Sequence, residues 1–197
     1  MNHKAIFQNL PELLTERLRL RPLRSEDADD MFAYAKNPEL SQFTTWETHP
    51  DIAATQGYIS YVQARYLAGE PETWGVELRS TGCLIGTTGL LNLDAQANHI
   101  EIGYVLAPPY YGQGYATEAA RAAVHFAFTT LAVNKVVACC AALNVASERI
   151  MQKLGMTYEG CFRDHYCKRG SLLDIRFYGL LARDYLIDDK LTPYIDK

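Results

Sequence analysis

Residues 107–118 read APPYYGQGYATE and lie between a predicted strand that ends at Leu106 and a predicted helix that begins at Tyr115. The glycines at 112 and 114 allow the backbone to turn tightly here. The first amides of the helix have no partner within the helix, and they point outward at the positive end of the helix dipole. A loop of this composition is suited to binding a phosphate group.

The segments around this loop predict two parallel strands joined by a helix. His99–Leu106 is typical of a strand, and Tyr115–Leu131 has small and apolar side chains at helical spacing. Lys135–Leu143 has the continuous apolar core of a strand that is covered on both faces, as in a parallel pair. We therefore expect a right-handed crossover between the two strands.

The rest of the chain predicts further strands and helices and no linker. Basic and apolar residues alternate over Arg17–Leu23, as in a half-exposed strand, and Ser25 is the predicted N-cap of a helix that ends at Asn37-Pro38. Further helices are predicted over residues 52–67 and 146–154, and antiparallel hairpins over 74–93 and 158–182. The predicted fold class is α/β, one domain with flanking helices and a mixed central sheet of about seven strands.

Composition and charge argue against nucleic-acid and membrane partners. The chain is 48% hydrophobic and 21% charged, as in ordinary globular proteins, and its formal net charge is -4. General affinity for nucleic acid requires a clustered basic surface. The first residues lack the apolar core of a signal peptide, and the uncharged stretches are too short to span a membrane. We therefore expect a cytoplasmic protein.

The five cysteines do not indicate a disulfide framework or a metal site, because their number is odd and no C-x-x-C spacing occurs. Cys139 and Cys140 lie inside an apolar run, where buried, unreactive thiols are expected. The histidines also lack the spacing of metal ligands, so no metal is predicted.

Two other interpretations of the 107–118 loop are open. A dinucleotide-binding fingerprint also places G-x-G between a strand and a helix, but it requires a third Gly or Ala where this chain has Thr117. It also requires an acidic residue near the end of the next strand, where this chain reads VVACC. The second alternative is a purely structural turn, because glycines are common at helix starts.

The string YGQGYATEA at residues 111–119 resembles the acetyl-CoA loop of the GNAT superfamily of N-acetyltransferases. Gly114 and Ala116 fill the last two motif positions, and Tyr111 stands where most members have Gln or Arg, as in the branch that acetylates ribosomal-protein N-termini. Other similar pieces are ERLRLRP from Glu16, Ile85-Gly86, EIGY from Glu101, Asn144-x-x-Ser147 and KLGM from Lys153. The resemblance places the acetyltransferase domain at residues 15–186, between an N-terminal extension (1–14) and a C-terminal tail (187–197).

The resemblance implies that acetyl-CoA binds where two parallel central strands splay apart. The pantetheine arm is expected along Tyr104, Val105 and Leu106, and Asn144 is expected near the sulfur. The amides expected to hold the pyrophosphate belong to Gly112, Gln113, Gly114, Tyr115, Ala116 and Thr117. Arg149 and Lys153 lie four residues apart on a helix, as a 3'-phosphate clamp or as a solvated helix face.

Two residues are predicted to move protons in the transfer. An amine must lose a proton before or during attack, and Glu101 is the candidate base; the alternative is a solvated or salt-bridged strand carboxylate. Many family members place a Tyr seven residues after the Asn to protonate the departing thiolate, but this chain has Met151 there. Ser147 is the candidate acid, as in the similar branch, and it is otherwise a residue in the first turn of a helix.

The acceptor is predicted only as a primary amine, either a protein N-terminal α-amine or a small-molecule amine. Trp46, Tyr58 and Tyr166 are candidates to line its pocket, and Glu47 or Asp164 to attract its charge; aromatic packing is the alternative. The predicted function is acetyl transfer from acetyl-CoA by direct attack in a ternary complex. The alternative is a non-catalytic acyl-CoA-binding module, and a homodimer is an open expectation.

Overall fold

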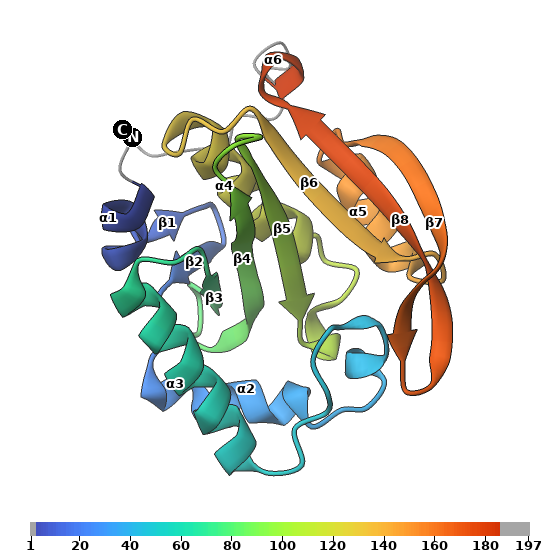
Figure 1. Cartoon of the computed structure of the whole chain (residues 1–197). Helices are drawn as coiled ribbons and strands as arrows, with labels where there is room; N and C mark the ends of the chain where they lie inside the picture. The colour runs from blue at the N-terminus through green and yellow to red at the C-terminus, as the bar shows by residue number, and fades with distance from the viewer. Residues whose placement is uncertain (1–2, 186–197) are drawn as a thin grey trace.

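An eight-stranded mixed sheet organises residues 3–185, the part of the chain that the structure, a computed structural model, describes (Figure 1). In spatial order the sheet runs β1-β2-β3-β4-β5-β6-β8-β7. The strands are β1 (Leu13–Leu14), β2 (Leu18–Arg21), β3 (Thr73–Leu78), β4 (Leu84–Asp94), β5 (His99–Leu106), β6 (Lys135–Ala141), β7 (Thr157–Lys168) and β8 (Ser171–Leu181). The α-helices are α1 (His3–Gln8), α2 (Ala28–Ala35), α3 (Ile52–Ala68), α4 (Tyr115–Thr129), α5 (Val145–Lys153) and α6 (Ala182–Tyr185).

The predicted α/β class and the parallel pair at its centre are confirmed. Strands β5 and β6 pair in parallel, and the other neighbouring strands pair antiparallel. The eighth strand is β1, whose two residues are too short to give a periodic signal in the sequence. The closing hairpin turns at Arg169 and Gly170, which both have positive φ as a type I′ turn requires.

The prediction that Ser25 caps a helix is wrong. Residues 25–27 form a short 3-10 helix whose N-cap is Arg24, and α2 begins only at Ala28. The carboxylate of Asp27 accepts a hydrogen bond from the Arg24 amide at 2.7 Å. Buried Arg21 holds that carboxylate through two further hydrogen bonds, at 2.7 and 2.8 Å. The carboxylate that satisfies the start of this turn therefore belongs to Asp27, and its ion pair with Arg21 is not visible in the capping pattern around Ser25.

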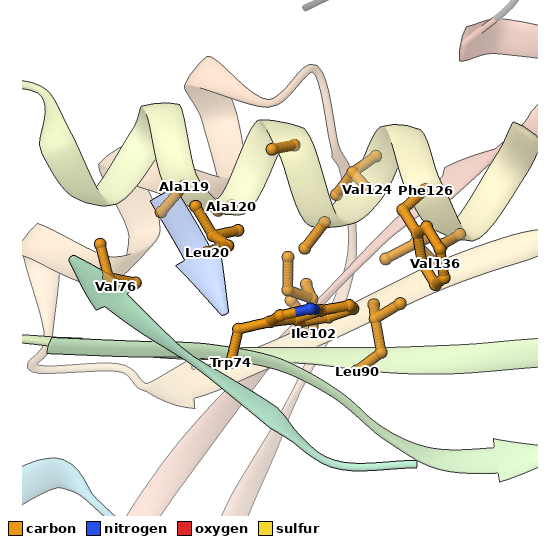
Figure 2. Close-up of a cluster of buried hydrophobic side chains, with 14 of the residues drawn as sticks. Leu20, Trp74, Val76, Leu90, Ile102, Ala119, Ala120, Val124, Phe126 and Val136 are labelled. Atoms are coloured by element: carbon orange, nitrogen blue, oxygen red, sulfur yellow. The ribbon is translucent and has the colours of Figure 1, made fainter. Parts of the chain in front are cut away.

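The core between α4 and the sheet explains why α4 is rich in alanine. Small side chains along α4, among them Ala119 and Ala120, let the helix lie close to the sheet (Figure 2). Trp74 is fully buried beneath the helix, with its ring edge-on to Phe126 at 5.4 Å. The Trp74 indole donates a hydrogen bond to the Pro11 carbonyl at 2.8 Å, which satisfies its one polar atom.

The structure describes most of the predicted N-terminal extension but not the predicted C-terminal tail. Residues 3–14 of the predicted N-terminal extension pack on the domain, because Phe7 of α1 is 1% exposed and β1 pairs with β2. The predicted C-terminal tail, residues 187–197, lies outside the described residues. Within residues 3–185, no helix is both long and apolar enough to cross a membrane.

Candidate functional site

Strands β5 and β6 separate after a short parallel ladder and leave a wedge between them (Figure 1). The last parallel pair is Glu101 with Val137, although both strands continue beyond it. Past this point β5 stays paired with β4 and β6 stays paired with β8. The β5 edge that faces the wedge therefore offers backbone groups to an incoming extended chain.

The two faces of β5 look toward different surroundings. Ile102 and Leu106 face α4 and belong to the core, whereas Glu101 and Val105 face the opposite side of the sheet. The predicted Ile85-Gly86 motif lies opposite on β4, where a Cβ atom on Gly86 would come within 2.2 Å of the Val105 carbonyl oxygen. A glycine at this position thus keeps β4 tight against β5 beside the wedge.

The predicted phosphate loop lies at the carboxyl end of β5, where it leads into α4. Gly114 is the N-cap of α4 and has φ +85, a conformation that side chains rarely adopt. The first backbone hydrogen bond of this turn runs from the Glu118 amide to the Gly114 carbonyl at 3.0 Å. The amides of residues 115–117 precede that bond and point out of the helix, as an anion site requires.

A contact set that sequence reasoning missed fixes this loop from the β1–β2 turn. We call it the loop clamp; it consists of Thr15, Arg17 and Glu118. The Arg17 guanidinium donates to the Glu118 carboxylate at 2.7 Å and to the Gln113 carbonyl at 3.0 Å, and it covers the Tyr115 ring at 4.3 Å. The Thr15 hydroxyl and the Arg17 amide also donate to Glu118, at 2.6 and 2.9 Å. The ERLRLRP motif was the available signal, but it predicts only a strand and a family resemblance, not a contact with the loop.

The structure brings Tyr104, Asn144 and Ser147 together on the α4 side of the wedge. The Asn144 side chain accepts a hydrogen bond from the Ser147 amide at 3.1 Å, which confirms it as the N-cap of α5. The Tyr104 hydroxyl lies 3.0 Å from the Ser147 hydroxyl and donates to the Ser147 carbonyl at 3.1 Å. Burial raises the pKa of Tyr104, so this phenol stays protonated at neutral pH.

Glu101 lies on the opposite face of β5 and is half-buried. Its carboxylate accepts hydrogen bonds from the Asn92 amide nitrogen at 2.8 Å and from the Cys139 thiol at 3.6 Å. No ion pair to Glu101 occurs among the described residues, so the salt-bridged alternative is not what this structure has. The Glu101 carboxylate is thus held by two hydrogen-bond donors and has no cationic partner among the described residues.

The prediction that both adjacent cysteines are buried is half wrong. Cys140 is buried and Cys139 is exposed, because successive strand residues point to opposite faces. Desolvation and the Glu101 carboxylate raise the pKa of the Cys139 thiol to about 12, and burial raises that of Cys140 to about 11. Both thiols are therefore protonated at neutral pH.

A narrow pocket lies on the Glu101 face, between α2, α3 and the strands β4 and β5. Its cavity volume is about 20 Å³, and its lining residues are Met31, Tyr34, Ala35, Trp46, His49, Tyr58, Thr87 and Val105. The His49 ring lies between Trp46 and Tyr58, with centroid distances of 5.5 and 6.1 Å, and Nδ1 bonds to the Thr55 hydroxyl at 2.8 Å. Burial lowers the pKa of His49, which keeps its imidazole neutral at neutral pH.

Only some of the predicted acceptor residues line the narrow pocket. Trp46 and Tyr58 line the pocket, but Tyr166 does not. Asp164 uses its backbone amide to bond the Asp174 carboxylate at 2.9 Å, away from the pocket lining. Tyr34 was not predicted, because α2 and the segment that carries Trp46 approach each other only in the folded chain.

The tip of the β7–β8 hairpin is bonded to the segment that carries Trp46 and His49. The Lys168 ammonium donates to the Trp46 carbonyl at 2.8 Å and to the Glu47 carboxylate at 2.6 Å. The Arg169 guanidinium donates to the other Glu47 oxygen at 3.1 Å and to the Thr48 hydroxyl at 3.0 Å. We call the contacts of Glu47 with Lys168 and Arg169 the strap.

Comparison with known proteins agrees with this architecture. The family model of the acetyltransferase (GNAT) domain matches residues 17–157. The uncharacterized N-acetyltransferase p20 of Bacillus licheniformis is 31% identical over 173 residues, which cover 88% of this chain and 97% of p20. The chain belongs to the GNAT family of acetyltransferases.

Two further similar proteins, one matched by sequence and one by fold, differ in what their names say they acetylate. The spermidine N(1)-acetyltransferase of Escherichia coli is 24% identical over 176 residues, which cover 89% of this chain and 91% of the E. coli protein. RimL, a ribosomal α-N-protein acetyltransferase solved in complex with coenzyme A, shares the fold with a TM-score of 0.78 at 18% identity. That alignment covers 88% of this chain and 99% of RimL. The GNAT family uses acetyl-CoA as acetyl donor.

The residues at the wedge fit this co-substrate. The outward-pointing α4 amides would hold its pyrophosphate, and the β5 edge at Tyr104–Leu106 would pair with its extended arm. Within residues 3–185, no three His, Cys, Asp or Glu side chains gather as a metal site would require. The individual site roles stay predictions.

Proposed function

We propose that this GNAT protein transfers acetyl from acetyl-CoA to a primary amine by direct attack in a ternary complex. The observation that carries the proposal is the wedge, whose two faces present different chemistry. One face has the α4 amides and Ser147, and the other has Glu101 and the narrow pocket. Donor and acceptor can thus reach one another across β5 without a covalent enzyme intermediate.

The cofactor half of the site acts mainly through the backbone. The amides of residues 112–117 hold the pyrophosphate, and the strand edge at Tyr104–Leu106 holds the pantetheine arm. Acetyl-CoA supplies an acyl group activated as a thioester. A backbone amide of the β5 edge donates to the thioester oxygen and stabilises the negative charge that develops there during attack.

Glu101 receives the proton that the acceptor ammonium must lose. Asn92 and Cys139 both donate hydrogen bonds to the carboxylate and so fix its orientation. Neither is a cation, so the carboxylate can still accept a proton. The amine nitrogen then forms the new C–N bond as the C–S bond breaks. Glu101 passes this first proton to solvent before the attack, so its carboxylate can accept the second N–H proton as the amide forms.

Ser147 returns a proton to the departing thiolate. A serine hydroxyl is a weak acid, and it needs a fixed geometry and a proton source to act. The Tyr104 hydroxyl, 3.0 Å away, fixes the Ser147 hydroxyl, and its own proton can turn from the Ser147 carbonyl to the Ser147 hydroxyl oxygen as Ser147 protonates the thiolate. Solvent then restores the Tyr104 proton. This hydrogen bond supports the predicted role of Ser147 and gives the Tyr104 side chain a role besides its backbone contact.

Thiol release from acetyl-CoA over an acceptor panel tests the proposal. The panel contains unbranched alkylamines, diamines, amino sugars and short peptides with free N-termini. Turnover with at least one amine, together with mass-spectrometric detection of the N-acetyl product, is the expected result. Saturable acetyl-CoA binding without turnover on any acceptor would instead support the non-catalytic acyl-CoA-binding module. A cytoplasmic location and a homodimer remain predictions.

A further inference from the structure

The strap occupies both oxygens of the one carboxylate in the segment 46–49. Lys168 bonds one Glu47 oxygen at 2.6 Å and Arg169 bonds the other at 3.1 Å. The two cations lower the pKa of Glu47, so the carboxylate stays ionised and paired. Lys168 is 7% exposed, which means that its charge is taken up by Glu47 and the Trp46 carbonyl and not by water.

The same strap fixes the wall of the narrow pocket. Trp46 and His49 line the pocket on either side of Glu47 in the chain, and Lys168 holds the Trp46 carbonyl directly. The lining has aromatic, aliphatic, hydroxyl and imidazole groups but no carboxylate, and its imidazole is neutral. An acceptor in this pocket therefore meets no group of opposite charge for a second ammonium.

We propose that the strap makes the protein selective for amines that carry a single positive charge. It does so by holding the segment that carries Trp46 and His49 in place and by neutralising Glu47. The inference rests on the proposed function and names the class of acceptor. A diamine or polyamine would bring a second ammonium into a narrow site whose one unpaired carboxylate, Glu101, is engaged by the reacting amine, and a buried cation without a partner is strongly unfavourable. A monoamine with an unbranched alkyl chain needs only apolar contacts beyond its reacting nitrogen. Lys168, Arg169 and Glu47 are thus positioning and specificity residues that do not touch the reacting atoms.

Two probes isolate the second charge. The acceptors n-butylamine and 1,4-diaminobutane have the same four-carbon chain and differ only in the second amine. For the wild type we expect kcat/KM to be higher for n-butylamine than for the diamine. A wild type that prefers the diamine would overturn the inference.

Two variants separate the charge of Glu47 from the integrity of the strap. The double variant Lys168→Met with Arg169→Gln breaks the strap and leaves Glu47 ionised and unpaired. Glu47→Gln also breaks the strap but removes the carboxylate. We expect the kcat/KM ratio of diamine to monoamine to rise about three- to fivefold in the double variant, the size expected for one solvent-exposed ion pair. In Glu47→Gln the ratio should not rise.

The outcomes distinguish this inference from the proposed function. A ratio unchanged in the double variant, or raised equally in Glu47→Gln, overturns the role of the strap while wild-type turnover still supports acetyl transfer. Absence of turnover on every amine in the wild type overturns the proposed function and this inference with it. The acetyl-CoA dissociation constant should stay near the wild-type value in both variants, because the strap lies away from the α4 loop. The melting temperature should fall in Glu47→Gln, because buried Lys168 loses its anionic partner there.

Discussion

The two faces of β5 differ in how their functional groups are assembled. On the α4 face, the loop at residues 107–118 forms from consecutive residues, and its chemistry comes from backbone amides at a helix start. On the other face, the pocket and the strap join segments as far apart as Glu47 and Lys168, 121 residues along the chain. Their chemistry comes from side chains. The donor side is thus encoded locally and the acceptor side by tertiary packing.

Replacement of Glu101 by Gln tests the acceptor face most severely. General bases contribute about 10²–10⁴-fold to turnover, so we expect kcat to fall by about 10³-fold at pH 7. The loss should shrink near pH 10, because a primary alkylamine resembles lysine, whose pKa is about 10.4, so about 30% of it is then deprotonated in solution, against about 0.04% at pH 7. Stopped-flow thiol release from pH 6.5 to 10 measures both effects. An unchanged pH profile would remove Glu101 as the base.

Replacement of Gly114 by Leu tests the donor face. A side chain is strained at φ +85, so the backbone that carries the loop amides must shift to accommodate it. We expect acetyl-CoA affinity to fall about 10²-fold, equivalent to about 2.7 kcal/mol. Isothermal titration calorimetry measures the affinity.

Gly82→Leu is the matched control for Gly114→Leu. Gly82 also has positive φ, at +74, but it lies in the β3–β4 turn and has no atom near its missing Cβ. The control should lose stability from backbone strain and keep its acetyl-CoA affinity. If both variants bind acetyl-CoA as the wild type does, the loop is not the pyrophosphate site.

The local encoding of the donor face explains what the sequence could predict. His99–Leu106 was predicted with the bounds of β5, and the helix start at Tyr115 was placed correctly, because periodicity and glycine positions are local signals. The pocket residue Tyr34 and the Lys168 contact to Trp46 had no such signal. Whether Cys139 or Cys140 is buried depends on the strand face, which a continuous apolar run does not reveal.

Replacement of Ser147 by Ala tests the proton source on the donor face. The Tyr104 hydroxyl lies 3.0 Å from the Ser147 hydroxyl, so removing the latter interrupts the path to the thiolate. We expect kcat to fall about 30-fold, which is less than the loss from Glu101→Gln. A coenzyme A thiolate can leave without being protonated, whereas an ammonium cannot attack until it has lost a proton. Acetyl-CoA affinity should change little. Tyr104→Phe should reproduce part of the kcat loss, and full activity in both variants would show that solvent protonates the thiolate.

The smallest expected effect concerns the loop clamp, and it refines the contrast between local and distant encoding. Arg17 lies about a hundred residues before the α4 loop, yet it holds both Glu118 and the Gln113 carbonyl. Arg17→Ala should therefore weaken acetyl-CoA binding about tenfold, or about 1.4 kcal/mol, because the loop must be ordered by the ligand itself.

Arg19→Ala is the control for Arg17→Ala, since Arg19 lies two residues further on, in β2. It pairs with Glu12 and Glu77 at 3.5 and 3.7 Å and does not contact the loop. Arg17→Lys should restore only part of the affinity, because an ammonium cannot bond Glu118 and the Gln113 carbonyl in the fixed geometry of a guanidinium. The KM for the amine should stay the same in all three variants. Equal losses of acetyl-CoA affinity in Arg17→Ala and Arg19→Ala would mean that β2 supports the fold without ordering the loop, and the donor face would then be encoded by its local sequence alone.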